Sequence, residues 1–252
     1  MRRLCVTDMR HLCATDMRCL GSTHRQSALA TKSFLNYISS MIRLHVFDID
    51  GTVLDSMKMW DNLAVQYLEN LGITPPDNIA EIIDPMTVPQ VHAYLADAFH
   101  IPGGAKAVQL SLDKYLMHQY SKILLPFEDA VKELEELHSA GQRMIAFSNT
   151  PHKYIDLAMG RLNLTKYFEK IYTVEETKNR KDSPEAFLEI CELAGREICE
   201  LAGRELCGTA GNNSCRFAKL RPDEVLVHDD SPFALEAAET AGCSIKRYNR
   251  YR

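Results

Sequence analysis

At residues 47–56 the chain reads Phe47-Asp48-Ile49-Asp50-Gly51-Thr52-Val53-Leu54-Asp55-Ser56, at the end of an apolar run that begins at residue 42. The apolar run is typical of a buried strand, and Gly51 marks the turn that ends it. Side chains alternate along an extended chain, so Asp48 and Asp50 point to the same side. Open α/β sheets bind their ligands at the carboxyl ends of the strands. We therefore expect the two carboxylates to address one reacting centre, where one can attack as a nucleophile while the other transfers protons.

The rest of the pattern predicts an α/β fold with a doubly wound parallel sheet. Four further short apolar runs are expected to be strands, and each is separated from the next by a helical pattern. Regular alternation of strands and helices favours a parallel sheet with right-handed crossovers, as in Rossmann-type folds. The expected strands lie at residues 143–147, 171–174, 224–228 and 244–248, and the expected helices at 127–141, 152–162, from 183 onward and at 231–242.

Residues 56–125 contain no strand pattern. Helical periodicity is present at residues 57–71, 88–99 and 105–121, and Gly or Pro residues separate these stretches. We interpret this segment as an all-helical domain inserted into the α/β core. The core then consists of residues 41–55 and 126–252.

Composition restricts the class of protein. The chain has 252 residues, 46% hydrophobic and 25% charged, with a formal net charge of −5, which is ordinary for a globular protein. No basic run indicates nucleic-acid binding, and no apolar stretch approaches the roughly 18 residues of a membrane helix. The cysteines form no C-x-x-C pair and follow no secretory apolar region, so we expect reduced thiols and a cytoplasmic protein.

Residues 1–40 differ from the rest of the chain. They hold six Lys or Arg residues against two acidic residues, and the sequence at residues 4–10 recurs in similar form at 12–18. A basic, acid-poor composition permits an organellar transit peptide. The alternative is a poorly ordered leader or a non-native start, with Met41 as the natural beginning, and we favour this alternative because Met41 directly precedes the first expected strand.

A second repeat lies in the C-terminal half. Residues 189–196 recur unchanged at residues 197–204. Two or three copies are too few for a repeat architecture, so we expect residues 189–216 to form a surface insertion within the core.

Two polar groups suited to binding an anion follow the expected strands. Ser148-Asn149 ends the second strand, and its hydroxyl and the neighbouring backbone N–H groups can hold a phosphate. Lys181 can place a positive charge on the same anion. Each feature alone is more often a turn or a surface charge. Their order along the chain and their position near strand ends make a shared site the better interpretation.

Acidic residues follow a further strand as Asp229-Asp230. Together with Asp48 they would form an all-oxygen site of the kind that Mg²⁺ prefers. Considered alone, these residues are equally well explained as the start of the helix at Ser231-Pro232, because acids are favoured at helix N-termini.

The ordered series Asp48-Ile49-Asp50-Gly51-Thr52, Ser148-Asn149, Lys181 and Asp229-Asp230-Ser231 resembles the motifs of the haloacid dehalogenase superfamily. The resemblance covers about residues 41–248 and is greatest to the phosphatase and β-phosphoglucomutase-like subgroup, which carries a helical cap after the first motif. It implies that Asp48 forms an aspartyl-phosphate and that Asp50 is the general acid and base.

The resemblance also implies ligands for the phosphoryl group and for the metal. Ser148, Asn149 and Lys181 would bind the phosphoryl group. The Mg²⁺ ion would be held by Asp48, by the backbone carbonyl of Asp50, and by Asp230 with help from Asp229.

The implied function is Mg²⁺-dependent hydrolysis of a small phosphorylated metabolite. Two alternatives stay open, a sugar-phosphate mutase of the same family and a catalytically inactive interaction protein. Related mutases carry a histidine five positions after the residue that corresponds to Asp55, whereas this chain has Trp60 there. Hydrolysis is therefore favoured.

Overall fold

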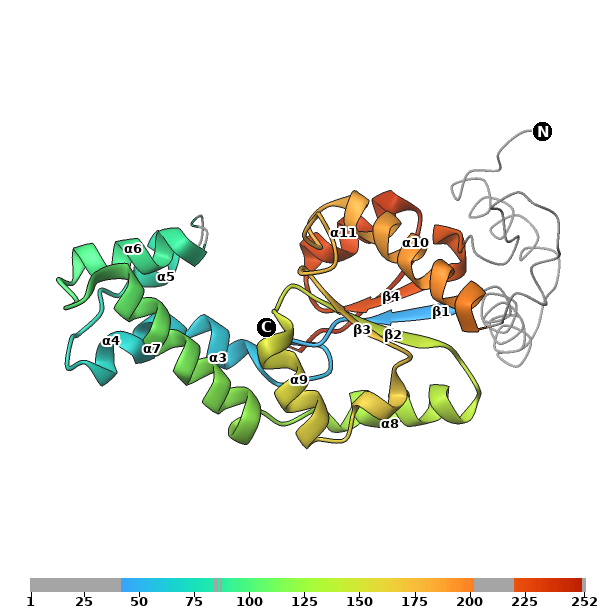
Figure 1. Ribbon diagram of the computed structural model, residues 1–252, viewed down its shortest axis with the longest axis horizontal. Coiled ribbons are helices and arrows are strands. Elements are labelled where there is room, and N and C mark those ends of the chain that lie inside the picture. Colours follow the sequence, from blue (N-terminus) through green and yellow to red (C-terminus); the bar gives the residue numbers. More distant parts are fainter. Residues whose placement is uncertain (1–41, 84–85, 87, 202–219, 251–252) are drawn as a thin grey trace, which may run out of the picture. The chain divides into compact units, whose positions relative to one another are not determined.

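The computed structural model describes residues 42–83, 86, 88–201 and 220–250. The chain from Arg43 onward forms one compact unit that contains a sheet of five parallel strands in the order β3-β2-β1-β4-β5 (Figure 1). The strands are β1 (Leu44–Phe47), β2 (Met144–Ser148), β3 (Ile171–Thr173), β4 (Val225–Asp229) and β5 (Ser244–Arg247). Because β1 pairs with both β2 and β4, the motif that follows β1 begins at the centre of the sheet. The predicted doubly wound parallel sheet is confirmed.

Helices cover both faces of this sheet (Figure 1). Leu44 and Val46 of β1 belong to the hydrophobic cluster of α10 (Pro184–Leu201) and α11 (Pro232–Ala241). Phe47 belongs instead to the cluster of α8 (Glu128–Ser139) and α9 (His152–Arg161). This division follows from the alternation of side chains along a strand. Two short 3₁₀ turns complete the core, η2 (Thr165–Tyr167) and η3 (Pro222–Glu224).

Between β1 and α8, the described residues form helices and no strand. The helices are α3 (Met57–Asp61), α4 (Leu63–Asn70), α5 (Ile79–Ile83), α6 (Val88–Ala98), α7 (Gly104–His118) and the π-helical turn η1 (Gln119–Ile123). Central members of this segment share a hydrophobic cluster of their own, which includes Leu68, Leu95 and Val108. The two ends of the segment instead pack into the core through Met59 and Tyr120.

Two details of this segment differ from the expectation. The helix expected over residues 57–71 is divided at Asn62, whose side-chain amide donates to the Lys58 carbonyl at 2.8 Å. Such a side-chain hydrogen bond takes the place of a regular helical one. Helix α5 has only five residues and was not predicted, because so short an apolar stretch carries no helical period.

The first copy of the C-terminal repeat is part of the core, so the expectation of a surface insertion is wrong for residues 189–195. Ile190, Cys191 and Ala194 of α10 are buried against the sheet, at the spacing of one helical face. Residues 202–219, and the leader at 1–40, lie outside the described residues.

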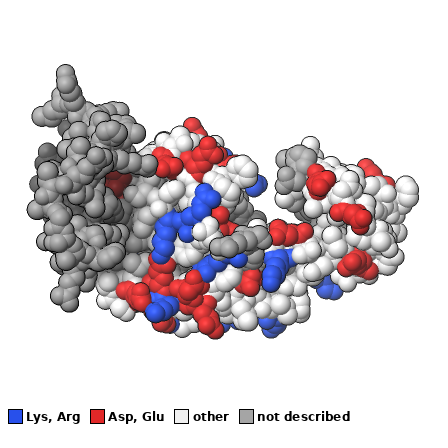
Figure 2. Space-filling view, turned by 180° about the vertical axis from the view of Figure 1, so that it is seen from behind, with Lys and Arg blue, Asp and Glu red and all other residues white. Residues whose placement is uncertain are grey.

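On the face drawn in Figure 2, basic side chains form a short band across the core, and acidic side chains lie on either side of this band. The absence of a nucleic-acid partner stays a prediction. Within the described ranges, no helix has the length and apolarity needed to cross a membrane.

Candidate active site

The first motif leaves β1 through a tight turn. The Asp48 amide still donates to the carbonyl of His228 on β4 at 2.8 Å, and the chain then folds back so that the Leu54 amide donates to the Ile49 carbonyl at 2.7 Å. Gly51 lies in this turn with φ +90°, a conformation that favours glycine. A Cβ atom at Gly51 would lie 2.4 Å from Oδ2 of Asp230. The turn therefore brings the first and last motifs into close contact.

Replacing Gly51 with alanine is expected to damage both folding and the acidic site. The positive φ should cost about 1–3 kcal/mol of unfolding free energy, and the new methyl group forces the Asp230 carboxylate to turn away. Thermal denaturation with and without Mg²⁺ would measure both effects. The matched control is Gly141→Ala, because Gly141 has φ +69° but open space at the Cβ position. If the two variants respond equally to Mg²⁺, the contact between Gly51 and Asp230 has no role in the acidic site.

Lys181 lies between two of the predicted carboxylates. Its Nζ atom is 2.6 Å from Asp48 Oδ1 and 2.5 Å from Asp229 Oδ2. The side chains are 4%, 8% and 1% exposed for Lys181, Asp48 and Asp229. The loop after β3 is tied to the loop after β2, because the Lys181 amide donates to Oδ1 of Asn149 at 3.1 Å. The structure thus brings Lys181, Asp48 and Asp229 together across the carboxyl edge of the sheet.

These buried groups shift one another's pKa values. Burial raises the pKa of Asp48 well above its ordinary value, and Lys181 opposes that shift while Asp229 adds to it. Burial would lower the pKa of Lys181, but the charges of Asp229 and Asp48 outweigh it and hold the pKa above the ordinary value. Burial and then the charge of Asp229 raise the pKa of Asp230 to about 6. Lys181 therefore stays cationic. Its single positive charge does not offset the effect of burial on the Asp48 and Asp230 carboxyls.

The residues present fit a divalent cation. Oxygen atoms of Asp48, Asp229 and Asp230 lie within 4.8 Å of one another, and Oδ2 of Asp48 is buried without a hydrogen-bond partner. When all three carboxylates are ionised, the single ammonium of Lys181 leaves two negative charges unbalanced, and Mg²⁺ would supply the balancing charge. Carboxylate oxygens are also the ligands that Mg²⁺ prefers. Both the donor set and the unpartnered oxygen therefore support the predicted metal site.

Ser148 and Asn149 occupy the end of β2, beside the first motif. Ser148 is buried, and its Oγ accepts a hydrogen bond from the Thr150 amide at 3.0 Å. The Asn149 side chain accepts from the Lys181 amide, so its observed contact positions the lysine loop. Their binding of a phosphoryl group stays a prediction.

Two aromatic residues that the sequence patterns did not identify as functional lie beside the site. The Tyr120 hydroxyl donates to Oδ1 of Asp50 at 2.6 Å, and the Trp60 indole Nε1 donates to the Tyr120 oxygen at 3.1 Å. The Trp60 side chain packs against the core, and its indole nitrogen also has this specific partner. The sequence places Tyr120 at the end of the helix expected over residues 105–121. That position does not indicate a contact with Asp50, which is distant in the sequence.

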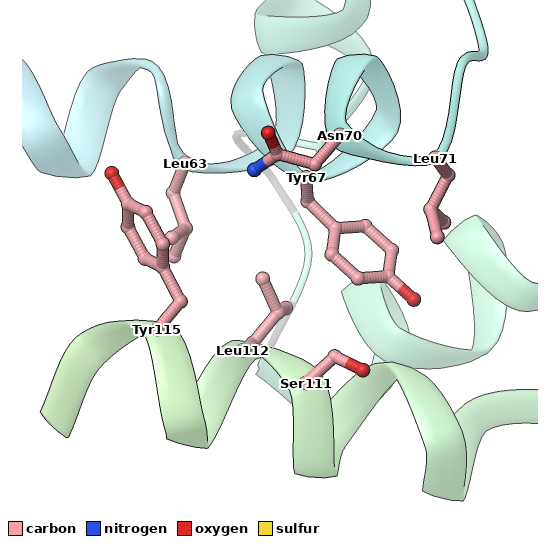
Figure 3. Close-up of a pocket in the computed structure, with 7 residues that line it drawn as sticks. All are labelled: Leu63, Tyr67, Asn70, Leu71, Ser111, Leu112 and Tyr115. Carbon is pink, nitrogen blue, oxygen red and sulfur yellow. The ribbon is translucent and has the colours of Figure 1, made fainter. Parts of the chain in front are cut away.

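A shallow pocket of about 160 Å³ lies apart from these residues, between α4 and α7 (Figure 3). It is lined by Leu63, Tyr67, Asn70, Leu71, Ser111, Leu112 and Tyr115. None of these side chains carries a full charge, so the pocket does not suit a phosphate.

Comparison with known proteins places the chain among hydrolases. A sequence model described as haloacid dehalogenase-like hydrolase matches residues 45–202. The phosphoglycolate phosphatase of Aquifex aeolicus is 25% identical over 205 residues, which cover 80% of this chain and 82% of that protein. The phosphorylated carbohydrates phosphatase of Thermotoga maritima is 22% identical over 199 residues, which cover 78% of this chain and 80% of that protein.

Solved structures agree on the fold. A HAD hydrolase of family IA, variant 3, from Entamoeba histolytica matches with a TM-score of 0.59 at 13% identity, over 81% of this chain and 82% of that one. A HAD-superfamily hydrolase of subfamily IA, variant 1, from Geobacter sulfurreducens matches with a TM-score of 0.55 at 19% identity, over 84% and 89%.

Proposed function

The chain belongs to the haloacid dehalogenase-like hydrolase family, and from this premise we propose that it is a Mg²⁺-dependent phosphatase of small phosphate monoesters. The observation that carries the proposal is the buried Lys181 ammonium, which contacts Asp48 and Asp229 within an otherwise acidic site. A cation fixed beside a carboxylate lowers the repulsion between that carboxylate and an approaching phosphate.

Asp48 is the proposed nucleophile. One oxygen of Asp48, Oδ1, receives the Lys181 hydrogen bond, and the other has no partner in the described structure. In the first step a carboxylate oxygen of Asp48 bonds to phosphorus while the bond from phosphorus to the ester oxygen breaks. Asp50 gives its proton to the departing oxygen. In the second step Asp50 takes a proton from water, which attacks phosphorus and releases phosphate from Asp48.

The metal would be held by Asp48, Asp229 and Asp230, with the backbone carbonyl of Asp50 as a further ligand. When bound, Mg²⁺ would neutralise the charge that spreads over the phosphoryl oxygens during transfer. Lys181, and by our proposal Ser148 and Asn149, would bind the remaining oxygens and keep the group in line with Asp48.

We further propose that residues 56–125 act as a cap over the site. The C-terminal end of this helical segment contacts the first motif, because the Tyr120 hydroxyl donates to Asp50. The N-terminal end is joined to it through Trp60, whose indole donates to the Tyr120 oxygen. Residues placed in this way can exclude water and select the substrate. Relatives named phosphoglycolate phosphatase support a small phosphorylated acid as substrate, and the relative named for phosphorylated carbohydrates supports sugar phosphates.

Hydrolysis is favoured over phosphoryl transfer to a sugar. The position of the mutase histidine is held by Trp60, whose indole is engaged with Tyr120. A mutase would convert a sugar monophosphate to its isomer without releasing phosphate, so product analysis separates the two functions.

Removal of the metal is expected to abolish turnover. Phosphate release from a panel that contains p-nitrophenyl phosphate, 2-phosphoglycolate and hexose phosphates should depend on Mg²⁺, disappear with excess EDTA and return when Mg²⁺ is restored. Mg²⁺ should also raise the melting temperature, because a ligand that binds the folded state stabilises it. An Asp48→Asn preparation controls for contaminating phosphatases. Absence of phosphate release from every ester in the presence of Mg²⁺ would refute the proposal.

A further inference from the structure

The π-helical turn η1 brings a phenol to the predicted acid/base residue. The hydroxyl of Tyr120 is 2.6 Å from Oδ1 of Asp50, and the Tyr120 side chain is completely buried. The other carboxylate oxygen, Oδ2 of Asp50, is buried and has no hydrogen-bond partner in the described structure. One oxygen of Asp50 is therefore held and the other is free. π-helical turns within helices are frequent at functional sites.

The direction of the hydrogen bond follows from the neighbours of Tyr120. The Trp60 indole N–H can only donate, and it reaches the phenol oxygen at 3.1 Å. A phenol is neutral near pH 7 and carries one proton on its oxygen. That single proton is left for Oδ1 of Asp50.

We propose that Tyr120 is a positioning residue that fixes the Asp50 carboxyl and confines its transferable proton to Oδ2, with Trp60 orienting the Tyr120 hydroxyl. An oxygen that already accepts the phenol proton is a poor place for a second proton, so the acidic form of Asp50 carries its proton on Oδ2. The inference rests on the proposed function, because it assigns Asp50 the role of acid.

This role predicts a dependence on the leaving group. When an alkyl ester bond breaks, the departing alkoxide must take the proton from Oδ2 of Asp50. The p-nitrophenolate ion is stable without that proton, so its departure does not require a well-placed acid. A misplaced Asp50 should therefore impair the cleavage of alkyl phosphates more than that of p-nitrophenyl phosphate.

The test is Tyr120→Phe, which removes the hydroxyl and keeps the ring. The value of kcat/KM reports the steps up to departure of the leaving group, and it should fall about 10-fold or more for 2-phosphoglycolate or β-glycerophosphate, since general acid catalysis contributes about 10²–10⁴-fold. For p-nitrophenyl phosphate it should fall less than about 3-fold, because the acid adds little there. We compare the variants by the ratio of kcat/KM for the alkyl phosphate to kcat/KM for p-nitrophenyl phosphate. Trp60→Phe should lower this ratio by a smaller factor than Tyr120→Phe does. In an Asp50→Asn background, Tyr120→Phe should change neither substrate further.

Tyr167→Phe is the matched control. Tyr167 is also buried and donates to a carboxylate, Glu135 at 3.0 Å, elsewhere in the core. Its loss should leave the ratio between the two substrates unchanged. Equal losses on both esters in folded Tyr120→Phe would overturn the positioning role, and if that variant does not fold, an unchanged ratio in Trp60→Phe would do so. Absence of activity in the wild type, or full activity in Asp48→Asn, would instead refute the proposed function.

Discussion

Replacement of Lys181 with methionine is expected to lower the free energy of unfolding by about 3–5 kcal/mol, because it leaves a buried, charged group without its partner. Methionine keeps most of the volume but removes the ammonium between Asp48 and Asp229, whose carboxylates then face each other in a site almost closed to water. Turnover should fall by about 10²–10³-fold, the usual effect of removing one preorganised electrostatic contact. Urea denaturation and steady-state phosphate release measure the two losses.

The design of this experiment separates charge from packing. Lys153→Met is the matched control, since Lys153 pairs with Asp113 at 2.8 Å but the two side chains are 49% and 33% exposed. An exposed pair contributes at most about 1 kcal/mol. Adding Asp229→Asn to Lys181→Met should restore part of the stability without restoring turnover. Mg²⁺ should raise the melting temperature of Lys181→Met more than that of the wild type, because it supplies the missing positive charge. Equal stability losses in Lys181→Met and Lys153→Met would contradict the account of Lys181 as the buried counter-ion.

The convergence of the motifs could be predicted because it follows from topology. In a parallel sheet the carboxyl ends of all strands meet at one edge, so polar residues after β1, β2 and β4 must lie near one another. Asp48 and Asp229 meet in this way, and Lys181 reaches them from the loop after β3. Local patterns fixed these positions, since each strand is a short apolar run followed by a turn residue.

The contacts of Asp50 could not be predicted in the same way. Tyr120 is 70 positions away in the sequence and approaches through a π-helical turn, which no hydrophobic period encodes. The Asn149 side chain posed a similar difficulty. An amide can bind an anion or hold a neighbouring loop, and the sequence does not show that it accepts from the Lys181 amide.

The first copy of the C-terminal repeat shows why duplication is a poor guide to burial. An exact duplication suggested a surface insertion, but the first copy supplies Ile190 and Ala194 to the core. Its amphipathic spacing is that of any helix on a sheet, and this spacing is better guidance than the repetition.

Replacing Asp48 or Asp50 with asparagine, one at a time, is expected to show which residue is the nucleophile and which is the acid. Asp48→Asn should reduce turnover by about 10⁴-fold or more, as loss of a covalent nucleophile does, and no phosphoryl group should remain on the protein after an acid quench. Asp50→Asn should lose about 10²–10⁴-fold, yet the protein should become phosphorylated on Asp48 by p-nitrophenyl phosphate, whose leaving group needs no proton. The phosphorylated form should accumulate because its hydrolysis requires the missing base.

Intact-protein mass spectrometry measures the added phosphoryl group, and Asp55→Asn, just outside the paired aspartates, is the matched control. Accumulation in Asp48→Asn rather than in Asp50→Asn would reverse the assignment, because the phosphoryl group can be trapped only on the residue that attacks.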